Sequence, residues 1–350
     1  EEYADAGASS AGTSEFRWTD DSSAPGGGFW IYNLDSKALG LVVNNLLLCV
    51  SCLAVFVGTL YPLALETWNG AKISVGPPYF NLTFGPIILP LLMLVPIGPF
   101  LAWKRGDLGQ AMRRLRIALV LSLAVGLLVL VLNVRGPWLA PFGMALGAWL
   151  LFGALTEVAN RIALFKAPLS VSLQRLIGLP RAAIGMVLAH GGLGIMVMGI
   201  IAISLWKVEV IVAMKPGETA DVAGYAVTFK GETPLTGPNY TGLAGQFDVT
   251  RDGQDVARLV SEKRNFKPSG MPTTEVGLHQ SLAGDLYVVM GDANPDGGRS
   301  MRLYFNPLVN LIWLGAALMF LGGAFSLADR RYRVGAPRPS AAPGKAVAAE

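Results

Sequence analysis

Six long apolar segments constrain the fold of this chain more than any other feature of its sequence. They cover about residues 40–64, 84–103, 117–134, 137–155, 183–206 and 307–328. A helix needs about 20 mostly apolar residues to cross the hydrocarbon core of a bilayer, and each segment is close to that length. The sequence therefore predicts a membrane protein whose main part is an all-α transmembrane bundle of about six helices.

The amino-acid composition supports the membrane class. Hydrophobic residues make up 52% of the 350 residues and charged residues only 15%, whereas soluble proteins carry about 25% charged residues. The chain is therefore too apolar for an ordinary soluble domain, and far too apolar for a disordered one. Its first residues include Glu1, Glu2 and Asp5, and they lack the basic segment and early apolar core of a secretory signal peptide.

Basic residues indicate which ends of the apolar segments face the cytoplasm. Lys and Arg gather in 104–116, in 156–182 and after residue 328, whereas 65–83 carries one basic residue, Lys72. Because cytoplasmic loops carry the excess of Lys and Arg, we expect these three segments and both chain ends on the cytoplasmic side. The net charge of +4 is then explained by membrane orientation, and no nucleic-acid partner is expected.

A polar segment, 207–306, separates the last two apolar segments and has a different pattern. Short runs of alternating apolar residues recur at 208–214, 225–231, 246–260, 285–292 and 300–305. Asp252-Gly253 is a strong hairpin signal, and Gly297-Gly298 indicates another turn. Several short strands at this spacing predict a small antiparallel sandwich or barrel. The orientation of the spans places this β domain on the outer, periplasmic side.

These patterns together predict the domain organisation. The expected parts are a flexible N-terminal segment 1–38, five transmembrane helices in 39–206, the periplasmic β domain 207–306, a last transmembrane helix 307–329 and a cytoplasmic tail 330–350. The two terminal parts are low in complexity, one rich in Ser, Gly, Ala and acidic residues and the other in Pro and Ala, so no secondary structure is predicted for them.

Cys49 and Cys52 form a Cys-x-x-Cys motif inside the first apolar segment. A thiol–disulfide exchange site needs a helix N-terminus or a cationic neighbour that lowers the thiol pKa, and no charged residue lies beside this pair. Free cysteine behaves as a small hydrophobic residue, which favours a structural role. A transmembrane thiol-redox protein acting through Cys49 and Cys52 is the alternative interpretation.

His190 is the most informative candidate residue, because it lies inside the apolar segment 183–206. An ionisable residue within a span is a functional candidate, and a neutral imidazole is a common axial ligand of haem iron. Gly191, Gly192 and Gly194 remove side-chain bulk beside it, which suits a flat macrocycle and equally suits a closely crossing helix. The residues alone leave open a haem ligand and a buried, hydrogen-bonded histidine.

The remaining polar candidates favour structural roles. Asn44 and Asn45 are expected to hydrogen-bond a neighbouring helix, and Glu157, at the end of its span, is expected to be solvated. His279 is expected to be a surface histidine of the β domain. The aromatic and proline-rich loop 66–83 either anchors at the membrane interface or lines a groove.

Twelve short motifs in order resemble the CcmF family of cytochrome c-type biogenesis proteins. They are NNLLL, VGTLYPL, ISVGPPYFN, GPFLAWKRG, GMVLAHGGLG, TGPNY, VTRDG, EKRNF, PTTEVGLH, GDLYVVMGD, RLYFNPLVNLIWLGAALMFLGG and DRRYR, within about residues 28–333. Each is weak alone, and the set is specific. The resemblance is to the C-terminal half of the family, because the Trp-rich haem-handling motif and the family's upstream histidines are absent from this sequence. The chain is then a fragment or the product of a split gene.

The resemblance implies a haem lyase component of system I cytochrome c maturation in the bacterial inner (cytoplasmic) membrane. The family receives haem from a haem chaperone and joins it to the two thiols of a Cys-x-x-Cys-His motif in apocytochrome c. The implied partners are the N-terminal half of the same protein, the haem chaperone, thiol-handling proteins, apocytochrome c and the lipid bilayer. A non-catalytic docking subunit of the same complex is an alternative.

His190 matches the family's second outward-site histidine, which implies that it is an axial ligand of the haem iron and that the second ligand lies outside this chain. No catalytic side chain is expected, because the reacting sulfurs belong to apocytochrome c and the alkene to haem. One expectation conflicts with this match. His190 lies nine residues after Arg181, about 13 Å along a helix, and is therefore nearer the cytoplasmic end than an outward site requires.

Overall fold

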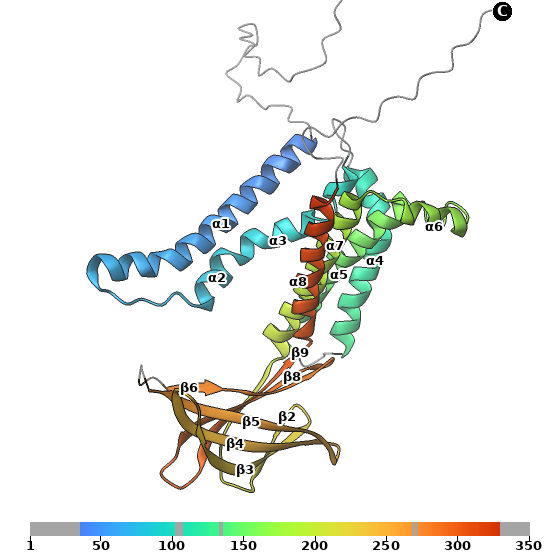
Figure 1. Cartoon of the computed structure of the whole chain (residues 1–350). Coiled ribbons are helices and arrows are strands. Elements are labelled where there is room, and N and C mark those ends of the chain that lie inside the picture. Colours follow the sequence, from blue (N-terminus) through green and yellow to red (C-terminus); the bar gives the residue numbers. More distant parts are fainter. Residues whose placement is uncertain (1–35, 102–107, 133–135, 268–269, 271, 330–350) are drawn as a thin grey trace, which may run out of the picture.

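The computed structural model of the chain describes residues 36–101, 108–132, 136–267, 270 and 272–329. A group of long helices occupies one end of the molecule and a β-sandwich the other (Figure 1). Of the predicted flexible segment 1–38, residues up to 35 lie outside the described part, and 36–38 belong to the first helix. The predicted tail 330–350 lies outside it entirely.

The helical part confirms the predicted bundle of about six helices. Its elements are α1 (Ser36–Asn69), α2 (Pro77–Thr83), α3 (Gly85–Leu94), the 3-10 turn η1 (Gly98–Phe100), α4 (Leu108–Leu132), α5 (Ala140–Arg161), α6 (Leu169–Ile177), α7 (Arg181–Trp206) and α8 (Asn310–Leu327). Among the described residues, five helices are long and apolar enough to cross a membrane. The bent pair of α2 with Gly85–Phe100 is a sixth candidate.

The segment 84–103, predicted as one span, is broken instead of continuous. Helix α3 ends at Leu94, a turn follows, and the helical pair on either side of residue 84 is bent by 48°. Pro86 at the start of α3, and Pro96 and Pro99 after its end, explain the break, because proline lacks the backbone N–H and clashes with the preceding turn of a helix.

The predicted loop 66–83 is also largely helical. Helix α1 continues to Asn69, and α2 occupies the end of the predicted loop. Tyr79 of α2 donates a hydrogen bond to the carbonyl of Ala54 at 3.0 Å, and its ring lies where a Cβ on Gly58 would be. The aromatic residue Tyr79 therefore serves to pack α2 on α1.

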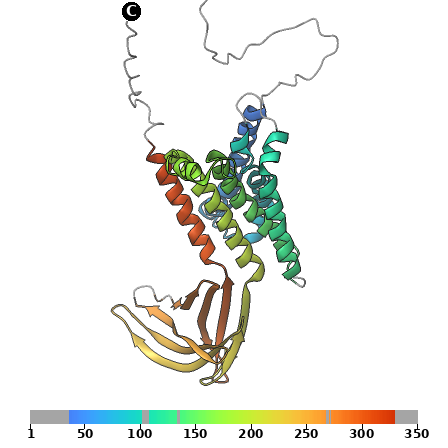
Figure 2. The ribbon, with the colours of Figure 1, turned by 90° about the vertical axis from the view of Figure 1, so that its right-hand side faces the viewer.

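The centre of the bundle is a row of closely packed helices. Helix α5 packs between α4 and α7, and α7 packs between α5 and α8 (Figures 1 and 2). Small residues stand at the crossings, where they let two backbones approach. A Cβ on Gly194 would lie 2.7 Å from the carbonyl oxygen of Gly147, and one on Gly192 would lie 2.7 Å from that of Gly315.

The β domain is a sandwich of two antiparallel sheets. Its strands are β1 (Val208–Met214), β2 (Thr219–Val222), β3 (Tyr225–Thr236), β4 (Tyr240–Arg251), β5 (Gln254–Phe266), β6 (Pro272–Glu275), β7 (Gly277–Ser281), β8 (Gly284–Ala293) and β9 (Arg299–Pro307). One sheet has the order β1-β9-β8-β7 and the other β2-β3-β4-β5-β6. Since β1 follows α7, β9 precedes α8 and the two strands pair, the sandwich is attached through two adjacent strands.

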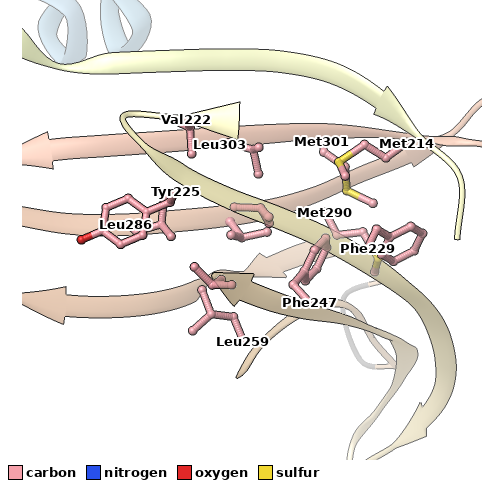
Figure 3. Packing of buried hydrophobic residues seen from close by; sticks show 13 residues of the cluster. Met214, Val222, Tyr225, Phe229, Phe247, Leu259, Leu286, Met290, Met301 and Leu303 are labelled. Atoms are coloured by element: carbon pink, nitrogen blue, oxygen red, sulfur yellow. The ribbon is translucent and has the colours of Figure 1, made fainter. Parts of the chain in front are cut away.

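The alternating apolar residues of both sheets meet between the two layers (Figure 3). Phe229 and Phe247 face each other across β3 and β4, with ring centroids 5.2 Å apart. Met290 and Met301 of β8 and β9 belong to the same buried cluster. The alternation predicted a small antiparallel sandwich or barrel, and the two packed sheets show that it is a sandwich.

The hairpin between β4 and β5 turns at Asp252-Gly253, as predicted. Both residues have positive φ, 52° and 76°, and Arg251 pairs with Gln254. We expect Gly253→Ala to lower the free energy of unfolding by about 1 kcal/mol, because a Cβ disfavours the left-handed region. Chemical denaturation in detergent measures this loss. Gly298→Ala, at a turn residue without positive φ, is the control, and an equal loss in both variants would contradict the argument.

Candidate functional site

His190 lies near the middle of α7 and far from the β domain. It follows Arg181 by nine residues and precedes Trp206 by sixteen, which the helical rise converts to about 13 Å and 24 Å. Strand β1 begins two residues after Trp206. The imidazole is therefore held inside the helical part of the molecule, and it is not at the end that carries the sandwich.

Two faces of α7 are occupied by other helices. Gly191 and Gly194 face α5, while Gly185 and Gly192 face α8. The glycines beside His190 therefore allow neighbouring helices to approach α7, and the approach is closest at Gly192 and Gly194. Of the three, Gly191 has the most space, because a Cβ there would meet its nearest neighbour, Leu151 Cδ1, at an ordinary 3.7 Å.

His190 belongs to a third face of α7, whose residues one and two turns further along pack against both α3 and α5. Leu193 and Val197 follow it by three and seven residues and therefore share its face. Both pack in a cluster with Leu92 of α3 and Leu150 of α5. His190 itself is half-buried, and its imidazole makes no hydrogen bond to another described residue.

Helix α3 is fixed against α5 beside this face. The indole Nε1 of Trp149 donates a hydrogen bond to the carbonyl of Met93 at 3.0 Å. Pro96 fills the space that a Cβ on Gly153 would occupy. Both contacts hold the end of α3 and the turn after it against α5.

Glu157 is a candidate residue that the sequence argument missed. It was expected to be solvated at the end of its span, but only 4% of its surface is exposed. Arg161 Nε donates a hydrogen bond to Glu157 Oε1 at 2.8 Å, and Nη2 of the same guanidinium forms an ion pair with that oxygen at 2.7 Å. In contrast, Oε2 is buried without a hydrogen-bond partner among the described residues. The i,i+4 spacing of Glu157 and Arg161 was the available signal.

Cys49 and Cys52 lie on a different helix from His190. Both are free thiols on the exposed surface of α1, a helix that packs mainly against α2 and α3. The predicted interhelical hydrogen bond of Asn44 and Asn45 is wrong for the described residues, because Asn44 donates to Asn45 within α1 at 3.3 Å. In Figure 1, α1 slants away from the central row of helices toward its C-terminal end.

His279 is separated from His190 by the domain boundary. It lies on β7 and pairs with Leu286 of β8. It is half-buried on this strand, between the exposed residues Leu278 and Gln280, and its imidazole lies beside Tyr225, with ring centroids 6.3 Å apart. The part of the chain that the structure describes contains no group of three or more His, Cys, Asp or Glu residues able to hold a metal ion.

Comparisons with known proteins agree with this architecture. The family model described as the CcmF C-terminal beta-sandwich matches residues 205–307. The cytochrome c-type biogenesis protein CycK of Rhizobium meliloti is 48% identical over 302 residues, which is 86% of this chain and 45% of that protein. CcmF of Escherichia coli is 34% identical over 302 residues, 84% of this chain and 44% of that protein.

A solved structure shares the fold. The protein described as cytochrome c heme lyase CcmF aligns with a TM-score of 0.64 at 24% identity, over 83% of this chain and 46% of that one. The chain therefore spans slightly less than half the length of each of these relatives. The chain therefore belongs to the CcmF family of cytochrome c-type biogenesis proteins, as these sequence identities, the sandwich and the helices that flank it in the sequence show.

Proposed function

We propose that this chain is part of a cytochrome c haem lyase and that its His190 is an axial ligand of the haem iron. One observation carries the proposal. The imidazole of His190 is half-buried near the middle of a span and lacks a hydrogen-bond partner among the described residues. The chain that contains it matches cytochrome c-type biogenesis proteins over more than four fifths of its length. A neutral imidazole in that position is a suitable haem ligand.

The residues around His190 fit one side of such a site. The face of α7 that carries His190 is lined by apolar residues of α3 and α5, which would exclude water from a bound macrocycle. The chain provides one axial histidine here, so the second ligand would come from outside it. When bound, haem supplies the vinyl groups for thioether formation with the Cys-x-x-Cys-His motif of apocytochrome c. The contribution of this chain would be to bind and orient haem.

The depth of His190 bears on where haem would sit. The family resemblance implied an outward-site ligand, but a histidine about 24 Å of helix away from Trp206 is poorly placed for the outer surface. We therefore propose that His190 holds haem within the membrane-spanning part.

The orientation in the membrane is proposed from charge. Arg161, Lys166, Arg175 and Arg181 lie on α5, α6, α7 and the connections between them, at the end of the helical part opposite the sandwich (Figure 1). Because basic loops stay on the cytoplasmic side, the β domain would face the periplasm of a bacterium and both ends of the chain the cytoplasm. The membrane would be the inner membrane.

The proposed partners follow from the part of the family that this chain spans. The N-terminal part of the same protein, fused or separate, would supply the second ligand and cover apolar surface of α1 such as Leu46, Leu53 and Phe56, which is exposed here. Haem chaperone, thiol-handling proteins and apocytochrome c would bind the assembled protein. Complementation tests this: a strain lacking its own family member, given this chain together with the N-terminal part, should regain covalent haem on cytochrome c, and failure of this stably inserted pair would contradict the proposal.

The alternative, a thiol-redox protein, gives an opposite expectation for the cysteines. We expect Cys49→Ser with Cys52→Ser to leave covalent cytochrome c within about twofold of the wild type, because both side chains lie on the exposed surface of α1 and behave there as small hydrophobic groups. Haem staining of cytochrome c in the complemented strain measures the yield. Loss of maturation with normal membrane insertion would favour the redox alternative. Cys49→Ala with Cys52→Ala controls for the polarity of serine.

A further inference from the structure

Glu157, on the spanning helix α5, has a buried carboxylate with one oxygen that lacks a hydrogen-bond partner. Among the described residues of α5, α7 and α8, no other carboxylate has this property. Oε1 of Glu157 is satisfied by Arg161, but its Oε2 has no hydrogen-bond partner among the described residues. A buried acceptor without a partner is unfavourable, and such atoms are rare in folded proteins, where a bound water or ion or a functional role commonly explains them. This oxygen therefore points to an interaction that the ion pair with Arg161 does not explain.

The packing of α5 on α7 brings Glu157 close to His190. Ala154 contacts the position of Gly191, the residue that follows His190. Glu157 lies three residues further along α5, on the same side of that helix as Ala154, which places it beside the part of α7 that carries His190. Nevertheless, the side chains of Glu157 and His190 are not joined by a hydrogen bond in the structure.

We propose that Glu157 is the positioning partner of His190: its free carboxylate oxygen accepts the imidazole N–H that faces away from the haem iron, directly or through one water molecule. The inference rests on the proposed haem ligation. Histidines that bind metals commonly donate their second N–H to a carboxylate, a carbonyl or a water, which fixes the ring orientation and makes the imidazole a stronger ligand. Arg161 would hold the carboxylate in place from the other side.

The competing explanation is a purely structural ion pair between Glu157 and Arg161. The two explanations differ in what the haem experiences. A structural pair influences only the stability of the helices. A positioning carboxylate also controls how tightly His190 holds haem and the reduction potential of the iron, because hydrogen bonding beyond the ligand is one of the ways in which proteins tune haem.

The test uses membranes that contain the chain together with the N-terminal part of the protein. Glu157→Gln keeps the shape and an acceptor oxygen but removes the charge. We expect it to raise the midpoint reduction potential of bound haem by about 59 mV, a tenfold change in the ratio of reduced to oxidised haem at fixed potential. Glu157→Leu also removes the acceptor, and we expect it to lower haem content about 10- to 100-fold. Redox titration and the absorption spectrum provide readouts that do not depend on maturation activity.

Arg161→Gln is the matched control, because it breaks the ion pair but leaves the carboxylate. We expect its haem potential to stay the same or fall. If Glu157→Gln and Arg161→Gln lower the protein level equally and neither Glu157 variant changes the potential or the haem content, the positioning role is wrong. His190→Ala separates the two proposals. If it removes haem while the Glu157 variants change nothing, ligation stands and positioning fails. If it leaves haem content and spectrum unchanged, haem ligation by His190 is itself wrong.

Discussion

Replacing His190 by alanine is expected to abolish covalent cytochrome c formation and to remove haem from the assembled protein. Loss of a residue that merely supports a metal ligand costs about 10- to 100-fold in affinity, and loss of the ligand itself should cost at least as much. The cavity left by the imidazole should be tolerated, because His190 is only half-buried. Absorption spectra of the purified complex and haem staining of cytochrome c measure the two losses.

His279→Ala is the matched control for the loss of His190. It removes the second of the two histidines in the sequence, and this residue lies in the sandwich against Tyr225. We expect it to retain haem and maturation. If His190→Ala retained normal cytochrome c yield while deletion of 207–306 abolished it, the chain would act as a docking subunit and the ligand assignment would be abandoned.

Replacing Gly192 by leucine is expected to prevent α7 and α8 from packing. A Cβ on Gly192 would lie 2.7 Å from the carbonyl oxygen of Gly315 and 3.0 Å from the amide nitrogen of Met319. Both atoms belong to the backbone of α8, so no side chain can rotate away to make room. We expect a loss of about 3 kcal/mol or more in stability, at the upper end of the range for overpacked cores. Thermal unfolding in detergent and the steady-state protein level measure it.

Gly323→Leu provides the control for added bulk in a spanning helix. Gly323 also lies on α8, but a Cβ there would meet nothing within 4 Å. We expect Gly323→Leu to keep the wild-type level and midpoint. Equal losses in the two variants would show that the glycines matter for helix flexibility or insertion and not for close approach.

The length and pattern of apolar residues made much of the fold predictable. A span is set by the thickness of the bilayer, so the segments that became α4, α5, α7 and α8 could be found by length alone. Strand β1 occupies the predicted run 208–214. The turn at Asp252-Gly253 was predictable because Asp and Gly are favoured where a hairpin needs positive φ, which both residues adopt here. In each case the decisive interaction lies within a few neighbouring residues.

Strand β6 and the break in the span at 84–103 were not predicted, and each has a physical reason. Strand β6 is exposed along its whole length, so it has no apolar alternation to reveal it and forms by pairing with β5. The span at 84–103 was long and apolar enough, but hydropathy does not record where prolines interrupt the hydrogen-bond ladder.

Span length and residue alternation were enough to predict a membrane protein with a β domain between its last two spans and a histidine inside one of them. The packed helices were needed to show that the glycines next to this histidine contact α5 and α8, and that Glu157 is buried with a free oxygen. The reason is that span length and periodicity are properties of one segment. The residues that pack against Leu193 and Val197, on the face of His190, come from α3 and α5, and their approach depends on how separate helices pack.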